Sequence, residues 1–262
     1  AFHTNDELKE TLCTLREVGS VKESFNKLTF EFNKIFQNFQ CDIKDKTAQR
    51  MINTWNPYQV WYNFIFSRNI SYYATGTFRG TGFRDTAQDI IAMAGINLEK
   101  AKNKLRELFR QQYFDGHTNH YYFPIEGYEP VKSIHSDNHL WLVMSTHAIL
   151  TEEGDFSFLD ENIEYFDQGN DTIYFHLKKS ITFTLSNLGE NGFPLMLRSD
   201  WNDALFRVCR KGKGESIWTA MQLGVCLKHM IELSRIYKMS DDYENYKSLY
   251  DKFKNLTNSK AW

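Results

Sequence analysis

The chain has 262 residues, 31 Lys and Arg against 33 Asp and Glu, a formal net charge of -2 and a mean hydropathy of -0.53. This length and composition predict a globular protein with a substantial core. The near-zero net charge gives no electrostatic reason to expect a nucleic acid or an anionic membrane as a partner. No apolar stretch approaches the roughly 20 residues that cross a bilayer, so a membrane-spanning protein is not expected.

The cysteines and the chain ends carry further information. The sequence contains four cysteines, at Cys13, Cys41, Cys209 and Cys226. They are too few and too scattered for a disulfide framework or a CxxC metal site, so we expect reduced thiols in a cytoplasmic protein. The chain begins with Ala1 rather than Met, has no secretory signal, and stops at Trp262 without a helix stop. We therefore expect an internal fragment of a longer protein.

The first part of the chain is predicted to be helical. Apolar residues recur at helical spacing between Asn5 and Gln40, which predicts two helices with a break at Gly19 and Ser20. A third helix is predicted over residues 47–66, where Pro57 marks a kink or a restart.

Helices and long loops then alternate. We predict helices over residues 86–108, 138–150 and 216–237, whereas residues 172–186 fit either a helix or a strand. The loops cover residues 71–85, 113–136 and 189–213. Long loops inside a compact domain are usually functional. No βαβ pattern or G-x-G-x-x-G motif is present, so we predict an all-α domain whose loops at one end carry the chemistry.

The densest group of reactive side chains is Asp200-Trp201-Asn202-Asp203. Two carboxylates with a Trp and an Asn between them suit a site where one is held by hydrogen bonds and the other faces a ligand. A carboxyl group against an aromatic wall has a raised pKa and can donate a proton near neutral pH. The alternative is a turn whose Asp residues cap a helix.

A second group runs from Arg79 to Asp89 and contains Gly80 and Gly82. Glycines allow the backbone to approach a ligand, an Arg binds oxyanions, and an Asp accepts hydrogen bonds from sugar hydroxyls. The alternative is a loop before a helix, with Asp85 or Thr86 as the N-cap and with Arg79 and Arg84 in solvent.

A third group contains the four histidines His117, His120, His135 and His139. Their spacing lacks the Glu or Cys that would complete a recognisable zinc site, so we predict no bound metal. In the simpler interpretation, Asp137 caps a helix that begins near Asn138.

Five segments occur in the order found in glycoside hydrolase family 94. They are Trp55-Asn56-Pro57-Tyr58-Gln59, Arg79 to Asp89, Ser136 to Trp141, Asp200 to Asp203, and Gly212 to Ser216. From about Asp42 to Trp218 the chain resembles the cellobiose, cellodextrin, laminaribiose and chitobiose phosphorylases of that family. The resemblance implies a helical linker over residues 1–40. Residues 41–262 would form the N-terminal half of an (α/α)6 catalytic barrel, which is incomplete here.

The resemblance also implies a reaction. Members of the family cleave a β-glycosidic bond with inorganic phosphate, invert the anomeric centre and release an α-sugar 1-phosphate. By motif position, Asp203 would be the general acid, Arg79 would bind phosphate, and Arg84, Asp85 and Trp201 would bind the transferred glycosyl unit. The expected partners are a β-glucoside disaccharide or oligosaccharide and phosphate, which is a co-substrate, with no cofactor. We expect a homodimer of the intact protein, and an inactive fragment.

Three alternatives remain open at this point. A plain (α/α)6 hydrolase would need a second carboxylate to activate water. The chain could instead belong to the phosphorolytic domain of a larger cyclic β-1,2-glucan synthase, or be a non-catalytic sugar-binding module. The cleaved linkage is also open, although residues 204–209 resemble glucosyl more than N-acetylglucosaminyl enzymes.

Overall fold

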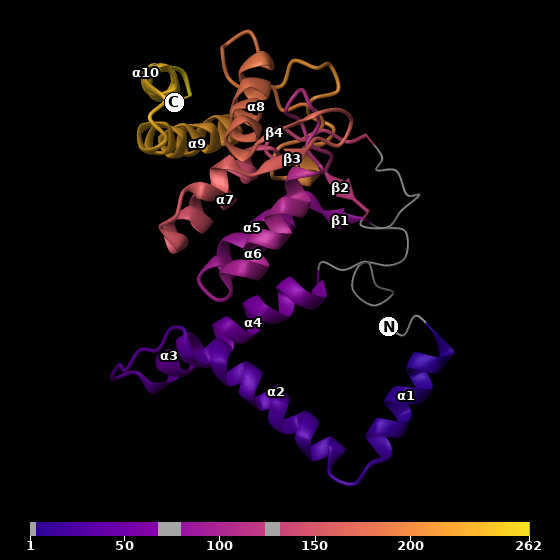
Figure 1. Ribbon diagram of the computed structural model, residues 1–262. Helices are drawn as coiled ribbons and strands as arrows, with labels where there is room; N and C mark the ends of the chain where they lie inside the picture. Colours follow the sequence, from indigo (N-terminus) through magenta and orange to yellow (C-terminus); the bar gives the residue numbers. More distant parts are fainter. Residues whose placement is uncertain (1–3, 68–79, 124–131, 262) are drawn as a thin grey trace. The chain divides into compact units, whose positions relative to one another are not determined.

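The computed structural model describes residues 4–67, 80–123 and 132–261. Helices dominate it, and the strands are only two or three residues long, so the prediction of an all-α protein is confirmed (Figure 1). The chain divides into two compact units, Ala1–Gln59 and Val60–Trp262. The predicted linker boundary near residue 40 stays a prediction.

The first unit begins with helices α1 (Asn5–Arg16) and α2 (Ser20–Gln37). The predicted break between them is confirmed at Gly19, whose φ of 94° is readily adopted only by glycine. α1 buries no residue and α2 buries only Ile35. The apolar stripes of both helices are therefore largely exposed within this unit.

The third predicted helix is a continuous helical segment that changes geometry along its length. It comprises α3 (Lys46–Arg50), the π-helix η1 (Met51–Trp55), α4 (Asn56–Tyr62) and the π-helix η2 (Asn63–Ser67). Asp45 caps it by accepting hydrogen bonds from the backbone N–H groups of Thr47 and Ala48. The restart predicted at Pro57 coincides with the return from π to α geometry.

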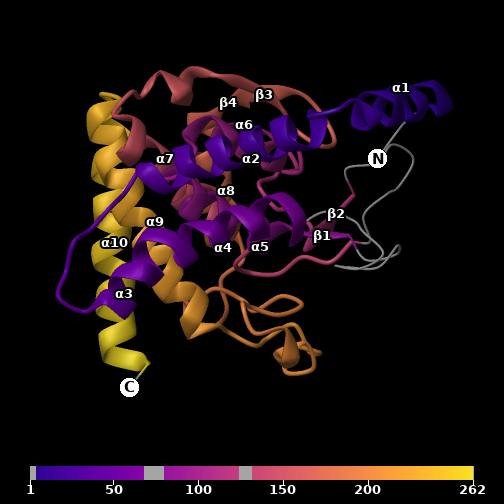
Figure 2. The same ribbon diagram turned by 90° about the horizontal axis from the view of Figure 1, so that it is seen from below.

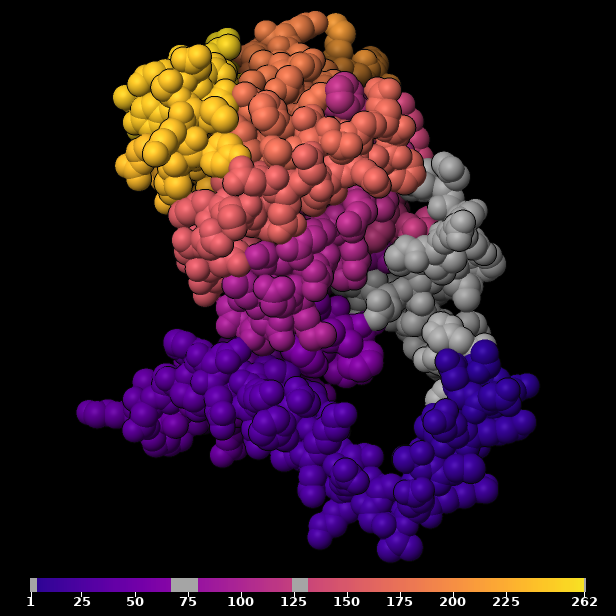
Figure 3. All heavy atoms as spheres, viewed as in Figure 1, coloured from indigo at the N-terminus to yellow at the C-terminus, as the bar shows by residue number. Residues whose placement is uncertain are grey.

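The described residues of the second unit form six longer helices. They are α5 (Phe83–Ala94), α6 (Leu98–Phe109), α7 (Leu140–Glu153), α8 (Ile173–Ser186), α9 (Ile217–Ile236) and α10 (Ser240–Lys260). α5 packs on α6 and α7, α7 packs on α8 and α9, and α9 packs on α10 (Figures 1 and 2). In the space-filling view these segments, coloured from magenta to yellow, form one continuous surface (Figure 3).

One helix prediction was wrong. The helix expected over residues 86–108 is two helices, because the chain breaks at Gly95 and turns before Asn97. The Asn97 side chain accepts a hydrogen bond from the backbone N–H of Lys100 and caps α6. Glycine disfavours helix and asparagine favours the N-cap, so local chemistry ends one helix and starts the next.

The core of this unit lies on the facing sides of its helices. Its fully buried side chains include Phe83, Ile90, Leu105, Phe109, Leu142, Ile149, Leu177, Leu223 and Leu227. Residues 172–186, which the sequence left open as helix or strand, form the helix α8. Its buried side chains contribute one side of this core. Among the described residues, no helix is long and apolar enough to span a bilayer.

Short pairings connect the loops of the second unit. β1 (Thr81–Gly82) pairs antiparallel with β2 (Tyr121–Tyr122), next to the N-terminus of α5. A separate bridge joins His135 to Leu197. A second hairpin, β3 (Asn162–Glu164) with β4 (Asn170–Thr172), precedes α8, and η3 (Ser157–Asp160) is a 3-10 turn. The first two pairings bring three sequence-distant loops together.

Candidate active site

These loops enclose a cavity of about 510 Å³. It is lined by His120, Tyr121, Lys132, Ser133, His135, Arg198, Asp203 and Phe206. The lining comes from the segment around β2, the segment before α7, and the long loop after α8. The volume lies in the range of small-molecule sites and is large enough for a sugar unit.

Asp203 presents its carboxylate to this cavity. It begins the short 3-10 helix η4 (Asp203–Leu205), and Asn202 caps that turn by accepting the backbone N–H of Ala204 at 3.1 Å. The Asp203 side chain is 55% exposed, and its Oδ1 accepts a hydrogen bond from Nη2 of Arg84 at 2.6 Å. The carboxylate is thus fixed on one side and accessible on the other.

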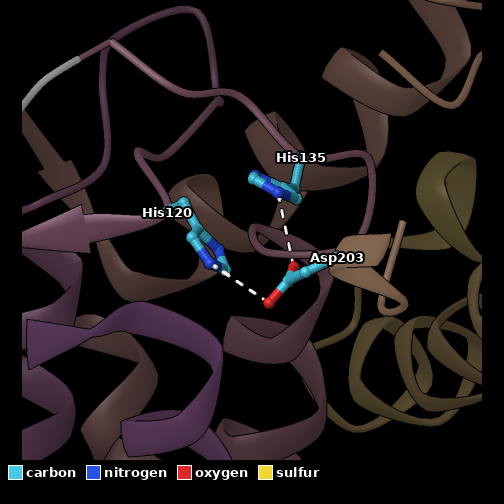
Figure 4. Close-up of side chains that lie close together, drawn as sticks. All are labelled: His120, His135 and Asp203. Atoms are coloured by element: carbon cyan, nitrogen blue, oxygen red, sulfur yellow. Dashed lines mark ion pairs between the residues drawn. The ribbon is translucent and has the colours of Figure 1, made fainter. Parts of the chain in front are cut away.

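Two buried histidines face the same carboxylate (Figure 4). Their Nε2 atoms lie 3.7 Å (His120) and 3.5 Å (His135) from the oxygens of Asp203, and their rings stack with centroids 3.9 Å apart. Burial lowers the pKa of both imidazoles, that of His135 to about 3, although Asp203 opposes this shift. Both rings are therefore neutral at pH 7. Sequence reasoning noted these histidines but did not place them beside Asp203.

Arg84 lies in the first turn of α5, and its buried guanidinium connects three aspartates. Nη1 donates to the backbone carbonyl of Asp200 at 3.0 Å and lies 3.4 Å from Oδ2 of Asp137, while Nη2 donates to Asp203. A planar fork with several donors suits such a bridge. Arg84 positions the loop that carries Asp203, a relationship that the sequence did not reveal.

The structure does not support the interpretation that Asp137 caps a helix. α7 has no side-chain cap at its N-terminus, and the Asp137 carboxylate instead accepts the indole N–H of Trp141 at 3.1 Å and contacts Arg84. Burial raises the pKa of Asp137 to about 6, against the opposing effect of Arg84. Asp137 is therefore a buried ion-pair partner of Arg84.

The other carboxylate of the Asp200-Trp201-Asn202-Asp203 segment is held by hydrogen bonds, as the sequence predicted for one of the pair. Asp200 is buried, and its two oxygens accept the backbone N–H of Asn202 at 2.9 Å and the hydroxyl of Ser216 at 2.7 Å. These bonds tie the loop to the start of α9. Asp200 therefore shapes the loop, and Asp203 is the one that faces the cavity.

The remaining predicted sugar-binding residues lie near Arg84. Trp201 is half-exposed, with its ring 5.9 Å from the Arg84 guanidinium carbon and stacked on Trp218. Asp85 is half-buried, and its Oδ2 lies so close to Gly82 that a Cβ at that glycine would approach within 2.2 Å. Gly82 thus leaves room for the Asp85 carboxylate. Arg79, the predicted phosphate ligand, lies outside the described residues.

His120, His135 and Asp203 are also the group of described residues that could hold a metal ion, with ligand atoms within 4.8 Å of one another. Neutral imidazoles and a carboxylate are suitable zinc ligands. However, Arg84 already pairs with Asp203, and its fixed positive charge opposes a cation there. The arrangement fits a protein-held carboxylate better than a metal centre.

Comparison with known proteins identifies the relatives of this site. The model of the glycosyl hydrolase 94 superfamily catalytic domain matches residues 31–262. Solabiose phosphorylase from Paenibacillus borealis is 29% identical over 88% of this chain and 28% of its own length. N,N'-diacetylchitobiose phosphorylase from Vibrio proteolyticus is 28% identical over 94% of this chain and 33% of its own length.

A larger protein is also similar. The cyclic beta-(1,2)-glucan synthase of Rhizobium meliloti is 26% identical over 89% of this chain and 9% of its own length. The chain spans about a third of the length of the two phosphorylases that it matches.

Proposed function

Because the chain belongs to the glycosyl hydrolase 94 superfamily, we propose that it contributes to the phosphorolysis of a β-linked glucose disaccharide or oligosaccharide. Inorganic phosphate would be the second substrate and α-glucose 1-phosphate the product. The observation that carries this proposal is the Asp203 carboxylate, which faces a sugar-sized cavity and is oriented by Arg84 at 2.6 Å.

Asp203 is proposed to protonate the departing glycosidic oxygen. A general acid must reach the oxygen that leaves, and Asp203 combines a fixed backbone with an accessible carboxylate. Arg84 would also bind the transferred glycosyl unit, as the family resemblance implies. When sugar hydroxyls take up its donors, Asp203 becomes free to turn toward the glycosidic oxygen.

Hydrolysis is the alternative reaction. An inverting hydrolase needs a second carboxylate to activate water on the face of the sugar opposite Asp203. Phosphate is already a nucleophile and needs no such base.

The other parts of the proposal rest on the resemblance. Phosphate would attack the anomeric carbon opposite Asp203 and invert it, with Arg79 as a phosphate ligand and Asp85 and Trp201 as donor-sugar contacts. No cofactor or metal takes part in this scheme, and the intact protein is proposed to be a homodimer. We also propose a cytoplasmic location, because the four cysteines are free thiols.

The test uses the intact polypeptide that contains this chain. α-Glucose 1-phosphate is measured after incubation with cellobiose, laminaribiose or sophorose, with and without phosphate. We expect strictly phosphate-dependent release that disappears in Asp203→Asn and persists in Asp6→Asn, an exposed aspartate of α1. Free glucose without phosphate would identify a hydrolase instead. Release from sophorose alone would favour the relationship to the β-1,2-glucan synthase.

A further inference from the structure

We propose that Thr219 is a positioning residue of the reaction, which orients the loop of Asp203 although it does not line the cavity. This proposal rests on the proposed function for the role of Asp203. It is carried by a series of buried hydroxyl groups that ends on the carboxylate of Asp200. Thr219 lies in the first turn of α9 and is fully buried.

Three buried hydroxyl groups, those of Ser136, Thr219 and Ser216, form what we call the hydroxyl chain. Oγ of Ser136 lies 2.8 Å from Oγ1 of Thr219, which lies 3.1 Å from Oγ of Ser216. Oγ of Ser216 lies 2.7 Å from Oδ2 of Asp200. All four residues are at most 5% exposed, so bulk water has little access to them. Each hydroxyl must therefore find its hydrogen-bond partners within the protein.

The carboxylate of Asp200 fixes the direction of every donor in the hydroxyl chain. A carboxylate only accepts hydrogen bonds, so Ser216 donates its single hydroxyl proton to Asp200. Ser216 can then only accept from the hydroxyl of Thr219, and Thr219 in turn accepts from Ser136. All three bonds thus point toward Asp200. Hydrogen bonds aligned in one direction polarise and strengthen one another.

The Thr219 hydroxyl does more than cap α9. Ser216 is the N-cap of this helix, and its Oγ accepts the backbone N–H of Thr219 at 3.1 Å. A side chain without a hydroxyl at position 219 would keep that bond. The hydroxyl of Thr219 occupies the second lone pair of the same oxygen, so the proton of Ser216 is directed to Asp200.

Asp200 passes this constraint to Asp203 along two routes. Its Oδ1 accepts the backbone N–H of Asn202 at 2.9 Å, and the Asn202 side chain caps the turn that begins at Asp203. Its backbone carbonyl accepts a hydrogen bond from Nη1 of Arg84 at 3.0 Å, and the same guanidinium donates to Asp203. The position of the proposed acid therefore depends on a hydroxyl group that lies outside the cavity.

Two substitutions at Thr219 separate the hydroxyl from the methyl group. Thr219→Val keeps the shape of the side chain and removes the hydroxyl, whereas Thr219→Ser keeps the hydroxyl and removes the methyl group. In the intact polypeptide we expect Thr219→Val to lower the kcat of phosphorolysis by about tenfold or more, because the acid is misplaced. The KM for the sugar should stay within about twofold of the wild type. Thr219→Ser should keep at least about half of the wild-type kcat.

A second measurement follows the loop itself and needs no substrate. Amide hydrogen exchange is measured by mass spectrometry on the peptide that contains Asn202 and Ala204, whose N–H groups are hydrogen-bonded within the loop. Exchange of this peptide should become at least about tenfold faster in Thr219→Val and stay near the wild-type rate in Thr219→Ser. Peptides of α10 should exchange at the wild-type rate in both variants.

Thr146→Val is the matched control for the loss of a buried hydroxyl. Thr146 is as buried as Thr219, but its hydroxyl donates to the carbonyl of Leu142 in the same helix. Its kcat and loop exchange should stay within about twofold of the wild type. Equal kcat and equal loop exchange in Thr219→Val and Thr146→Val would overturn the proposal. A Thr219→Ser protein as impaired as Thr219→Val would also overturn it, because packing of the methyl group would then be responsible.

The two measurements distinguish this proposal from the proposed function. If the intact polypeptide shows no phosphorolysis but the loop exchange responds as expected, the proposed function fails and the orienting role of Thr219 in the loop stands. If phosphorolysis occurs and Thr219→Val changes neither kcat nor loop exchange, only the role of Thr219 fails. Faster loop exchange with an unchanged kcat would likewise overturn that role, since the acid would not depend on the order of its loop.

Discussion

Nη2 of Arg84 donates a 2.6 Å hydrogen bond to Oδ1 of Asp203, a residue 119 positions later in the chain. The same guanidinium contacts the buried carboxylate of Asp137. Arg84, which is part of α5, therefore fixes the position of the Asp203 carboxylate that faces the cavity. Reaction rates depend steeply on how well an acid is placed, so this pair should control activity.

Arg84→Met tests that role. The substitution keeps the length of the side chain but removes the fork, so kcat/KM should fall by about 100-fold or more. Unfolding should also become easier by about 3 kcal/mol, because Asp137 loses its buried partner. Steady-state kinetics and urea denaturation measure the two effects.

Lys102→Met is the matched control for Arg84→Met. Lys102 pairs with Glu153 at 2.6 Å, and neither residue lines the cavity. Its kcat/KM should stay within about twofold of the wild type. An Arg84→Met protein with unchanged kcat/KM would contradict the positioning role.

Asp137→Asn should change how stability depends on pH. Burial raises the pKa of Asp137 from 3.8 to about 6 in the folded protein. Between these values the folded state holds the proton and the unfolded state does not, so the wild type loses stability as pH rises from 4 to 6. The loss relative to Asp137→Asn should be about 2 to 3 kcal/mol.

Urea unfolding at several pH values compares the wild type with Asp137→Asn. Asp155→Asn, at an exposed aspartate after α7, should follow the wild type over the same range. Parallel curves for wild type and Asp137→Asn would show that Asp137 does not titrate in this range.

His135→Gln should also change how stability depends on pH, but in the opposite direction to Asp137→Asn. Burial lowers the pKa of His135 from 6.5 to about 3. Below pH 6.5 His135 is therefore protonated in the unfolded state and neutral in the folded state. The wild type therefore loses stability as pH falls, by about 2 kcal/mol between pH 6.5 and 5 from this residue. Thermal unfolding at both pH values should show a smaller loss for the variant. A loss as large as in the wild type would mean that His135 is not the group responsible.

Gly82→Ala should impair the site with little effect on folding. The new Cβ would lie 2.2 Å from Oδ2 of Asp85, so the carboxylate must move, whereas the φ of -66° at Gly82 suits alanine. We expect kcat/KM to fall by about tenfold, since Asp85 is a proposed sugar ligand, with a change in unfolding free energy below about 1 kcal/mol.

Gly224→Ala controls for the loss of a glycine. Gly224 lies inside α9 with open space around it, so the substitution should stabilise the protein by about 0.5 to 1 kcal/mol and leave kcat/KM unchanged. If Gly82→Ala is equally active, the Asp85 carboxylate does not need its present position.

Local patterns account for much of the secondary structure. The apolar spacing of α2 and α9 and the break at Gly19 are visible in the sequence, because helical periodicity and glycine conformation are properties of neighbouring residues. The break at Gly95 was missed, since the apolar pattern continues on both sides of it. α10 was not predicted either, because it is largely polar and buries only Tyr246 and Phe253.

The resemblance to glycoside hydrolase family 94 also named Asp203 as the candidate acid, and the sequence suggested different tasks for the carboxylates of Asp200 and Asp203. It did not join Arg84, His120 and His135 to Asp203. That assembly depends on β1 with β2 and on the bridge between His135 and Leu197, which are pairings between distant loops. Helix periodicity encodes contacts within a few residues, whereas the meeting of loops is decided when the helices pack and bury their shared core.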